Sequence, residues 1–272
     1  MTNNVLTPLG RTRSSIDLPP KLERFKSLLY CPLDLAPMPE IDLQELLDWS
    51  MSVSSDHPNQ RGAIKLPSGQ TVLTPEQATK NKYGFYPWQS IWMKRSADFV
   101  PESNGWMMDF VEKFPAIVEY IKQFPLKEIS AVNLMWQKEG QPVMIHSDPE
   151  HWFGMRMYLA NTPNSLLYFM KTHAPINERV DYVTFDKEDA KLQEIVNTEK
   201  HFIKYLQPAH PWIINNVRAF HGVENYPNAL GTRAVLVIHG KFVNGESPLD
   251  FDKLYDILVR SVAKYPEHCV WY

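Results

Sequence analysis

The residues with the clearest capacity for chemistry lie in one short segment, GQPVMIHSDPEHW, residues 140–152. It holds His146, Asp148, Glu150 and His151 within six positions. In a strand, positions i and i+2 face the same side, so the imidazole of His146 and the carboxylate of Asp148 would point at one spot. An imidazole and a carboxylate at this spacing form half of a site for a divalent metal ion, and a ligand from another strand would complete it.

His221 is the best candidate for that third ligand. It lies in WIINNVRAFHGVEN, residues 212–225, where we expect an apolar strand that ends at this histidine. Gly222 follows it and permits a close approach of the backbone. Further on, Arg233 opens the apolar run RAVLVIHGKF. A buried guanidinium needs an anionic partner because an unpaired buried charge is costly, and its planar set of donors suits a carboxylate.

In chain order, the pattern is Gly-x5-His-x-Asp, 72 residues, a histidine, 11 residues and an arginine. It resembles that of the Fe(II)/2-oxoglutarate-dependent oxygenases over about residues 132–242. The resemblance implies a double-stranded β-helix, or jelly-roll, core. It implies that His146, Asp148 and His221 bind Fe(II), and that Arg233 binds the distal carboxylate of 2-oxoglutarate, with O2 as oxidant. Members that halogenate lack the carboxylate ligand, so hydroxylation or a related oxidation of an unactivated C–H bond is the reaction implied.

One position departs from the family pattern. Many members carry Arg-x-Ser, whose serine hydroxyl also contacts the oxoglutarate, but Val235 stands at that position here. Another donor is then required. Arg156 and Tyr158 share one face of their predicted strand, and either could supply it. The aspartyl/asparaginyl-hydroxylase-like branch also places an arginine on the strand after the first metal ligand, so both Arg233 and Arg156 are candidates for the main oxoglutarate anchor.

The substrate and the function class have alternatives. If Arg233 takes the oxoglutarate, Arg156 is available for a substrate carboxylate, which favours a small molecule such as an amino acid or a derivative. A residue of a protein is the alternative substrate. A non-catalytic jelly-roll protein could use the same cavity to bind a ligand without a redox metal. A zinc hydrolase would use Glu150 or Asp148 as general base.

The elements that must position these residues predict an α+β fold. Short apolar or alternating runs bounded by Pro, Gly and Asn are typical of strands in a β-sandwich or barrel. We expect such strands at residues 129–137, 142–146, 153–160, 165–171, 211–217 and 233–242. Apolar residues at helical spacing predict helices at 41–50, at 104–123 with Asn104 as cap and a break at Pro115, at 187–206, and at 251–264.

These elements suggest one oxygenase domain over residues 1–272. Residues 1–125 would be mainly helical or loop; the first 40 or so, rich in proline, would form an arm over the surface, and residues 52–99 a lid over the site. Residues 126–245 would form the jelly-roll core, and 246–272 would carry the C-terminal helix.

Charge and composition argue against several classes of protein. The 28 basic and 31 acidic residues leave a net charge of −3, which gives no general attraction to nucleic acid or anionic lipid. The longest uninterrupted aliphatic stretch, residues 234–238, is far shorter than the ~20 residues that span a bilayer. The polar N-terminus has no apolar signal-peptide core. We therefore expect a cytoplasmic enzyme whose partner is a small molecule, and the sequence leaves its oligomeric state open.

The numbers and positions of cysteines and glycines exclude further kinds of site. Cys31 and Cys269 are the two cysteines, at opposite ends of the chain, so they could be bridged only if the termini meet. We expect two free thiols and no cysteine zinc site. No two of the 11 glycines lie closer than five positions apart. This excludes a dinucleotide-binding G-x-G-x-x-G and a G-x-S-x-G nucleophile turn.

Overall fold

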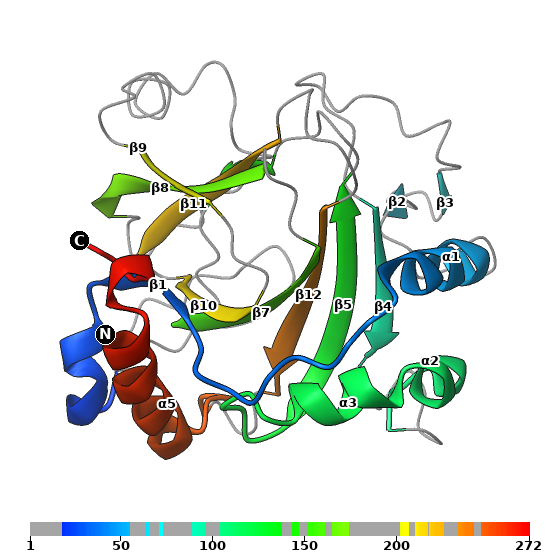
Figure 1. The fold of residues 1–272 in the computed structure, drawn as a ribbon, viewed down its shortest axis with the longest axis horizontal. Coiled ribbons are helices and arrows are strands. Elements are labelled where there is room, and N and C mark those ends of the chain that lie inside the picture. The colour runs from blue at the N-terminus through cyan, green and yellow to red at the C-terminus, as the bar shows by residue number, and fades with distance from the viewer. Residues whose placement is uncertain are drawn as a thin grey trace.

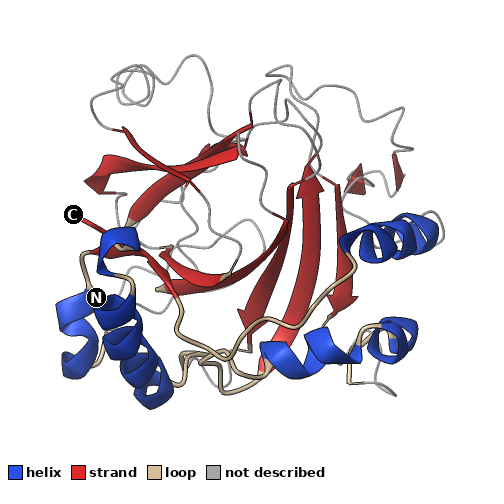
Figure 2. Cartoon of the chain, viewed as in Figure 1, coloured by secondary structure: helices blue, strands red, loops and turns tan. Residues whose placement is uncertain are grey.

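Two antiparallel sheets face each other at the centre of the molecule (Figures 1 and 2). The structure is a computed structural model. It describes residues 18–54, 64–65, 71–72, 89–95, 104–137, 143–146, 152–160, 165–173, 202–206, 210–216, 218–225, 233–241 and 246–272.

The larger sheet has seven strands and the smaller has four. The order in the larger sheet is β13 (Val270–Trp271), β1 (Leu28–Pro32), β10 (Pro211–Asn215), β7 (Phe153–Ala160), β12 (Arg233–Gly240), β5 (Ile129–Gln137) and β4 (Gln89–Lys94). The order in the smaller sheet is β6 (Val143–His146), β11 (Ala219–Asn225), β8 (Ser165–His173) and β9 (Phe202–Leu206). A separate two-stranded ribbon pairs β2 (Ile64–Lys65) with β3 (Thr71–Val72).

From β5 to β12 the chain passes repeatedly between the two sheets. Strands β5, β7, β10 and β12 belong to the larger sheet, whereas β6, β8, β9 and β11 belong to the smaller one. The space between the sheets is therefore walled by strands that are far apart in the sequence.

Helices lie on the outer side of the larger sheet, with α3 and α5 along the lower edge of Figure 1 and α1 and α2 at its right. They are α1 (Leu43–Ser54), α2 (Met108–Lys113), α3 (Pro115–Ile121) and α5 (Phe251–Lys264), with 3-10 turns η1 (Pro20–Phe25) and η5 (Pro266–His268). Asp250 caps α5 because its side chain accepts a hydrogen bond from the backbone N–H of Lys253. Phe114, with φ −124° and ψ 50°, separates α2 from α3 because a residue before proline is disfavoured in helical conformation.

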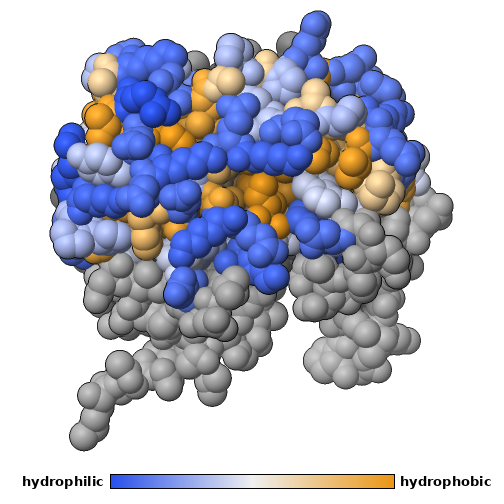
Figure 3. All heavy atoms as spheres, turned by 90° about the horizontal axis from the view of Figure 1, so that it is seen from below, coloured by the Kyte–Doolittle hydropathy of each residue, from blue (hydrophilic) through white to orange (hydrophobic). Residues whose placement is uncertain are grey.

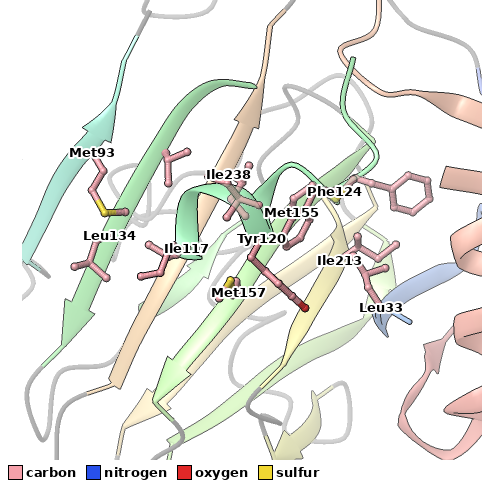
Figure 4. Packing of buried hydrophobic residues seen from close by; sticks show 14 of the residues in the cluster. Leu33, Met93, Ile117, Tyr120, Phe124, Leu134, Met155, Met157, Ile213 and Ile238 are labelled. Atoms are coloured by element: carbon pink, nitrogen blue, oxygen red, sulfur yellow. The ribbon is translucent and has the colours of Figure 1, made fainter. Parts of the chain in front are cut away.

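Alternation along the strands gives the larger sheet two different faces. Outward-facing Met155, Met157, Leu236 and Ile238 pack with the helices in one hydrophobic core (Figure 4). The inward-facing residues form a second cluster with residues of the smaller sheet, among them Tyr158, Trp212, Val235, Val237, Leu167 and Phe169. Figure 3 shows the helical side from outside, where hydrophobic areas lie between bands of hydrophilic side chains.

Much of the predicted secondary structure is confirmed. The strands at 129–137 and 153–160 and the helix at 251–264 have the predicted bounds. The predicted strands beginning near residues 142, 165, 211 and 233 form with their ends shifted by a few residues. The helical run broken at Pro115 is present as two short helices. The α+β class is therefore confirmed.

Two predictions about the N-terminal half are wrong. Residues 28–32 are no surface arm but a fully buried strand, β1, because every one of them is covered by β10, β13 or the cores. Together with β4, this strand adds the N-terminal half of the chain to the larger sheet. Asn104 does not cap a helix: it has φ 50° in a turn, and α2 begins at Met108. Most of the predicted lid, residues 52–99, lies outside the described residues.

Two predictions in the β region are also corrected. The helix predicted at 187–206 is wrong at its end, where residues 202–206 form β9 and pair with β8; residues 187–201 lie outside the described residues. His221 does not end the strand that begins at residue 211. That strand stops at Asn215, and His221 lies inside β11 of the other sheet. Among the described residues, no helix is both long and apolar enough to cross a membrane.

His210, directly before β10, makes the stability of the fold depend on pH. Its ring stacks on Tyr265 with centroids 5.7 Å apart, and its buried Nε2 has no hydrogen-bond partner within the described part of the chain. Burial, helped by the charge of His268, lowers the pKa of His210 from 6.5 to about 4. Because the folded protein holds this imidazole neutral, the unfolded chain takes up the proton first as the pH falls.

We expect His210 to stabilise the fold fully above pH 6.5 and to lose this contribution as the pH falls to about 4. The loss is roughly 1–2 kcal/mol in the free energy of unfolding, allowing for partial exposure of the ring. Urea unfolding at pH 7.5 and 4.5 measures it. His210→Gln should remove this part of the pH dependence, whereas His268→Gln should keep most of it. An unchanged pH dependence in His210→Gln would show that another group is responsible.

Candidate functional site

The register of the smaller sheet brings two of the predicted metal ligands together. His146 ends β6, and its backbone partner on the antiparallel neighbour β11 is His221. Directly opposite residues on antiparallel strands project from the same face, with Cβ atoms about 4.5–5.5 Å apart. These two histidines, 75 positions apart in the sequence, are therefore neighbours in the fold.

The ring of His221 is held in a defined orientation. Its side chain is buried, with 6% of the residue exposed. Its Nδ1 lies 3.1 Å from the carbonyl oxygen of Ala219, and Phe169 on β8 is its backbone partner on the other side. A hydrogen bond from Nδ1–H to a carbonyl places the proton on Nδ1 and leaves the lone pair on Nε2, which is the arrangement found in metal-binding histidines.

The third predicted ligand lies outside the described residues. Asp148 is two positions beyond the end of β6, and Glu150 and His151 follow it, all between residues 146 and 152. Within the described residues, no group of three or more His, Cys, Asp or Glu side chains is arranged to hold a metal ion. The structure thus pairs the backbones of the two candidate histidines, and the metal-binding role of all three residues stays a prediction.

Arg233 and Tyr158 form a buried pair on the inner face of the larger sheet. The Arg233 residue is only 5% exposed and Tyr158 is fully buried. Arg233 Nη2 donates a hydrogen bond to the Tyr158 hydroxyl, and its guanidinium lies 5.0 Å from the centre of the tyrosine ring. On its far side, Tyr158 stacks on Trp212 at 5.2 Å and 13°. The ring is therefore fixed between a cation and an indole.

The electrostatics of this pair keep the phenol protonated. Burial raises the pKa of Tyr158 above its ordinary value of 10.0, although the positive charge of Arg233 acts in the opposite direction. A protonated hydroxyl that accepts a hydrogen bond from an arginine can still donate a hydrogen bond to a second acceptor. Val235, which stands where many oxygenases have serine, is the backbone partner of Tyr158. The phenol thus lies on the strand next to the missing serine.

Arg156 lies one step further along the same face of β7 and is half-buried. Its Nη1 donates to the backbone carbonyl of Met155 at 3.2 Å. Gly154 makes room for it: a Cβ on that residue would lie 2.7 Å from Nη1 of Arg156 and 2.6 Å from Nδ2 of Asn216. The prediction that Arg156 and Tyr158 share a face of their strand is confirmed. Tyr158 is fully buried on that face, whereas Arg156 is half-buried.

Two polar residues on this face were not singled out from the sequence. Asn133 on β5 is 2% exposed and Asn216 is 1% exposed. The Oδ1 atom of each has no hydrogen-bond partner among the described residues. Asn133 has Val237 as backbone partner, and Val237 also pairs with Arg156. A signal for Asn133 was present in the sequence, since a polar residue amid an apolar alternating strand is unusual at a buried position.

Comparisons with known proteins give similarity at the level of fold. No protein-family model matches the sequence, and no curated protein matches it. SnoK, a non-haem alpha-ketoglutarate-dependent carbocyclase from nogalamycin biosynthesis, is 11% identical with a TM-score of 0.41, over 82% of this chain and 83% of SnoK. AviO1 from Streptomyces viridochromogenes Tue57 is 14% identical with a TM-score of 0.40, over 83% and 95%. EctD from S. alaskensis, solved with bound Fe, is 15% identical with a TM-score of 0.40, over 79% and 73%.

The Arg233–Tyr158 contact predicts a measurable effect on stability. Tyr158→Phe keeps the stacking on Trp212 but removes the oxygen that accepts from a buried cation. We expect a loss of about 1.5–3 kcal/mol in the free energy of unfolding by urea. Tyr272→Phe is the matched control, because that hydroxyl makes a 3.4 Å contact with the carbonyl of Arg218; it should cost less than about 0.5 kcal/mol. Equal effects of the two substitutions would contradict a special role for the buried pair.

Proposed function

We propose that this protein is a non-haem Fe(II)- and 2-oxoglutarate-dependent dioxygenase of the oxygenase superfamily named above. It would hydroxylate, or otherwise oxidise, an unactivated C–H bond of a small molecule. The observation that carries the proposal is the pairing of His146 with His221 across β6 and β11. This pairing brings together two of the three ligands that the sequence pattern requires for iron.

The order of the strands supports the proposal. In a double-stranded β-helix, eight strands are divided between two facing sheets, so that distant strands surround one interior. Strands β5 to β12 are divided in this way, four in each sheet, with β8 and β9 as neighbours in the smaller one. Such an interior allows His146, His221 and Arg233 to act on a single ligand although they are spread over 88 positions.

The residues present fit a ferrous ion. Two imidazoles and one carboxylate on one side of an ion form the facial set typical of non-haem Fe(II) oxygenases. In our proposal His146, His221 and Asp148 make up that set, and the carbonyl of Ala219 holds the ring of His221 with Nε2 as the ligating atom. When bound, Fe(II) with 2-oxoglutarate and O2 supplies the oxidising power, and succinate and CO2 are released.

The buried Arg233–Tyr158 pair fits the distal carboxylate of 2-oxoglutarate. The guanidinium would neutralise the carboxylate and donate hydrogen bonds to it. The neutral phenol already accepts a hydrogen bond from Arg233, and its own O–H would donate a hydrogen bond to a second carboxylate oxygen. Tyr158 would then replace the serine that many family members have at the position of Val235. Arg233 is the main anchor in this proposal because it is more deeply buried than Arg156.

Arg156 is then left for the substrate. It lies on the same inner face as the anchor pair. Its guanidinium and the amide of Asn216 both occupy the space that a side chain at Gly154 would take. A half-buried guanidinium in this position suits a carboxylate, as in an amino acid or a derivative. A carboxylate-bearing residue of a protein is the alternative substrate.

Anaerobic reconstitution tests the metal site. The purified protein with Fe(II) and 2-oxoglutarate should develop the weak visible metal-to-ligand charge-transfer band of a chelated oxoacid. His146→Ala and His221→Ala should each weaken iron binding at least 10–100-fold and abolish succinate release. His268→Ala, at an exposed ring, is the control and should leave both unchanged. An absent band in the parent, or hydrolysis with zinc and no oxoglutarate, would reject the proposal.

A pair of arginine substitutions separates the two anchors. Removing a charged hydrogen-bonding partner costs about 1.5–3 kcal/mol, so Arg233→Gln should raise the KM for 2-oxoglutarate by roughly 10–100-fold. Arg156→Gln should leave that KM within about threefold and instead lower the stimulation of succinate release by substrate. Measuring succinate against a panel of metabolites gives both quantities. If Arg156→Gln has the larger effect on the oxoglutarate KM, the roles are reversed.

A further inference from the structure

The fold brings the two cysteines of the chain into contact, although they are 238 positions apart. Cys31 lies in β1, and Cys269 directly precedes β13. Because Tyr30 pairs with Val270 in the antiparallel register, Cys31 and Cys269 are the next opposite pair. Their Sγ atoms are 3.4 Å apart, and both thiols are free. From the sequence, this contact required segments near the two ends of the chain to meet, and the pairing of β1 with β13 brings them together.

The geometry of this position suits a disulfide. Opposite residues in antiparallel strands have Cα atoms about 4.5–5.5 Å apart, which lies within the 4.4–6.8 Å range of disulfide-bonded cysteines. Closing the bond requires the sulfur atoms to approach from 3.4 Å to about 2.05 Å.

We propose that Cys31 and Cys269 form a reversible disulfide when the protein meets hydrogen peroxide, and that this bond fastens the C-terminal strand to β1. Neither cysteine belongs to the candidate iron or oxoglutarate site. The inference therefore stands independently of the proposed function, and it assigns a modification site at the junction of the two chain ends.

The two thiols have different roles in the reaction. Cys269 is the more exposed, whereas Cys31 is fully buried. The hydrogen bond between them lowers the pKa of Cys269 and raises that of Cys31, while burial and then the charge of Glu267 oppose the first effect. Cys269 thiolate attacks peroxide to give a sulfenic acid and hydroxide. The thiol of Cys31 then displaces water from the sulfenic acid and forms the disulfide. In total the two thiols and one peroxide give one disulfide and two waters.

The bond would reinforce a weak part of the fold. Strand β13 has two residues and pairs only with β1 among the described strands, apart from a backbone hydrogen bond from Tyr272 to Ser27. Strand β1 in turn carries Tyr30, whose ring lies 5.2 Å from that of Trp212 in the cluster between the sheets. A disulfide here closes a loop over most of the chain, and long loops restrict the unfolded state most. The cross-link should therefore raise thermal stability.

The parent protein provides the main test. Reduced protein treated with peroxide and then alkylated with a maleimide should lose two hydrogen atoms by intact mass, take up no label and remain a monomer on a non-reducing gel. Its Tm should rise by roughly 10 °C over the reduced protein, and dithiothreitol should reverse the change. Two labelled thiols after oxidation, a disulfide-linked dimer, or an intramolecular bond without a rise in Tm would each overturn the proposal.

Single substitutions test the order of the steps. In Cys31→Ser, peroxide should stop at a sulfenic acid on Cys269, which dimedone traps. In Cys269→Ser, the buried Cys31 should resist peroxide and gain no dimedone adduct. The Tm of neither variant should rise with peroxide. Dimedone labelling of Cys31 in preference to Cys269 would contradict the assigned roles, and circular dichroism of each variant before oxidation checks that it is folded.

Discussion

The account of the site depends on the backbone register between β6 and β11. A shift of one residue in either strand would turn its side chains to the opposite face, so the pairing of His146 with His221 requires this register. The neighbouring strand β8 stabilises the register, because it pairs with β11 along most of its length and buries Leu167 and Phe169 against the larger sheet. The chemistry proposed for the interior therefore rests on ordinary hydrophobic packing in the smaller sheet.

The two faces of the larger sheet differ in the residues that they bury. Its outer face packs against the helices in one hydrophobic core, whereas its inner face carries Arg233, Tyr158, Arg156 and Asn133 among apolar residues. On β7 the two faces alternate residue by residue, with methionines outward and Arg156 and Tyr158 inward. One strand thus contributes to both the core and the site.

The sequence predicted local features well and long-range placement less well. Strands at 129–137 and 153–160 were predictable because alternation and flanking proline or glycine are local signals. Strand β1 was not, since its burial depends on partners about 180 positions away in β10 and about 240 away in β13. The candidate ligands and anchor were found from spacing and residue type. Asn133 and Asn216 were not, because their inward position follows from the pairing of whole sheets. Asp148 lies outside the described residues, and its role, like those of His146, His221 and Arg233, stays a prediction.

Anomalous diffraction at the iron edge, from crystals grown anaerobically with Fe(II), tests the central claim most directly. The account predicts one strong peak between the sheets, about 2.1 Å from an imidazole nitrogen of both His146 and His221. A peak bound to only one of these histidines, or located elsewhere on the protein, would contradict it.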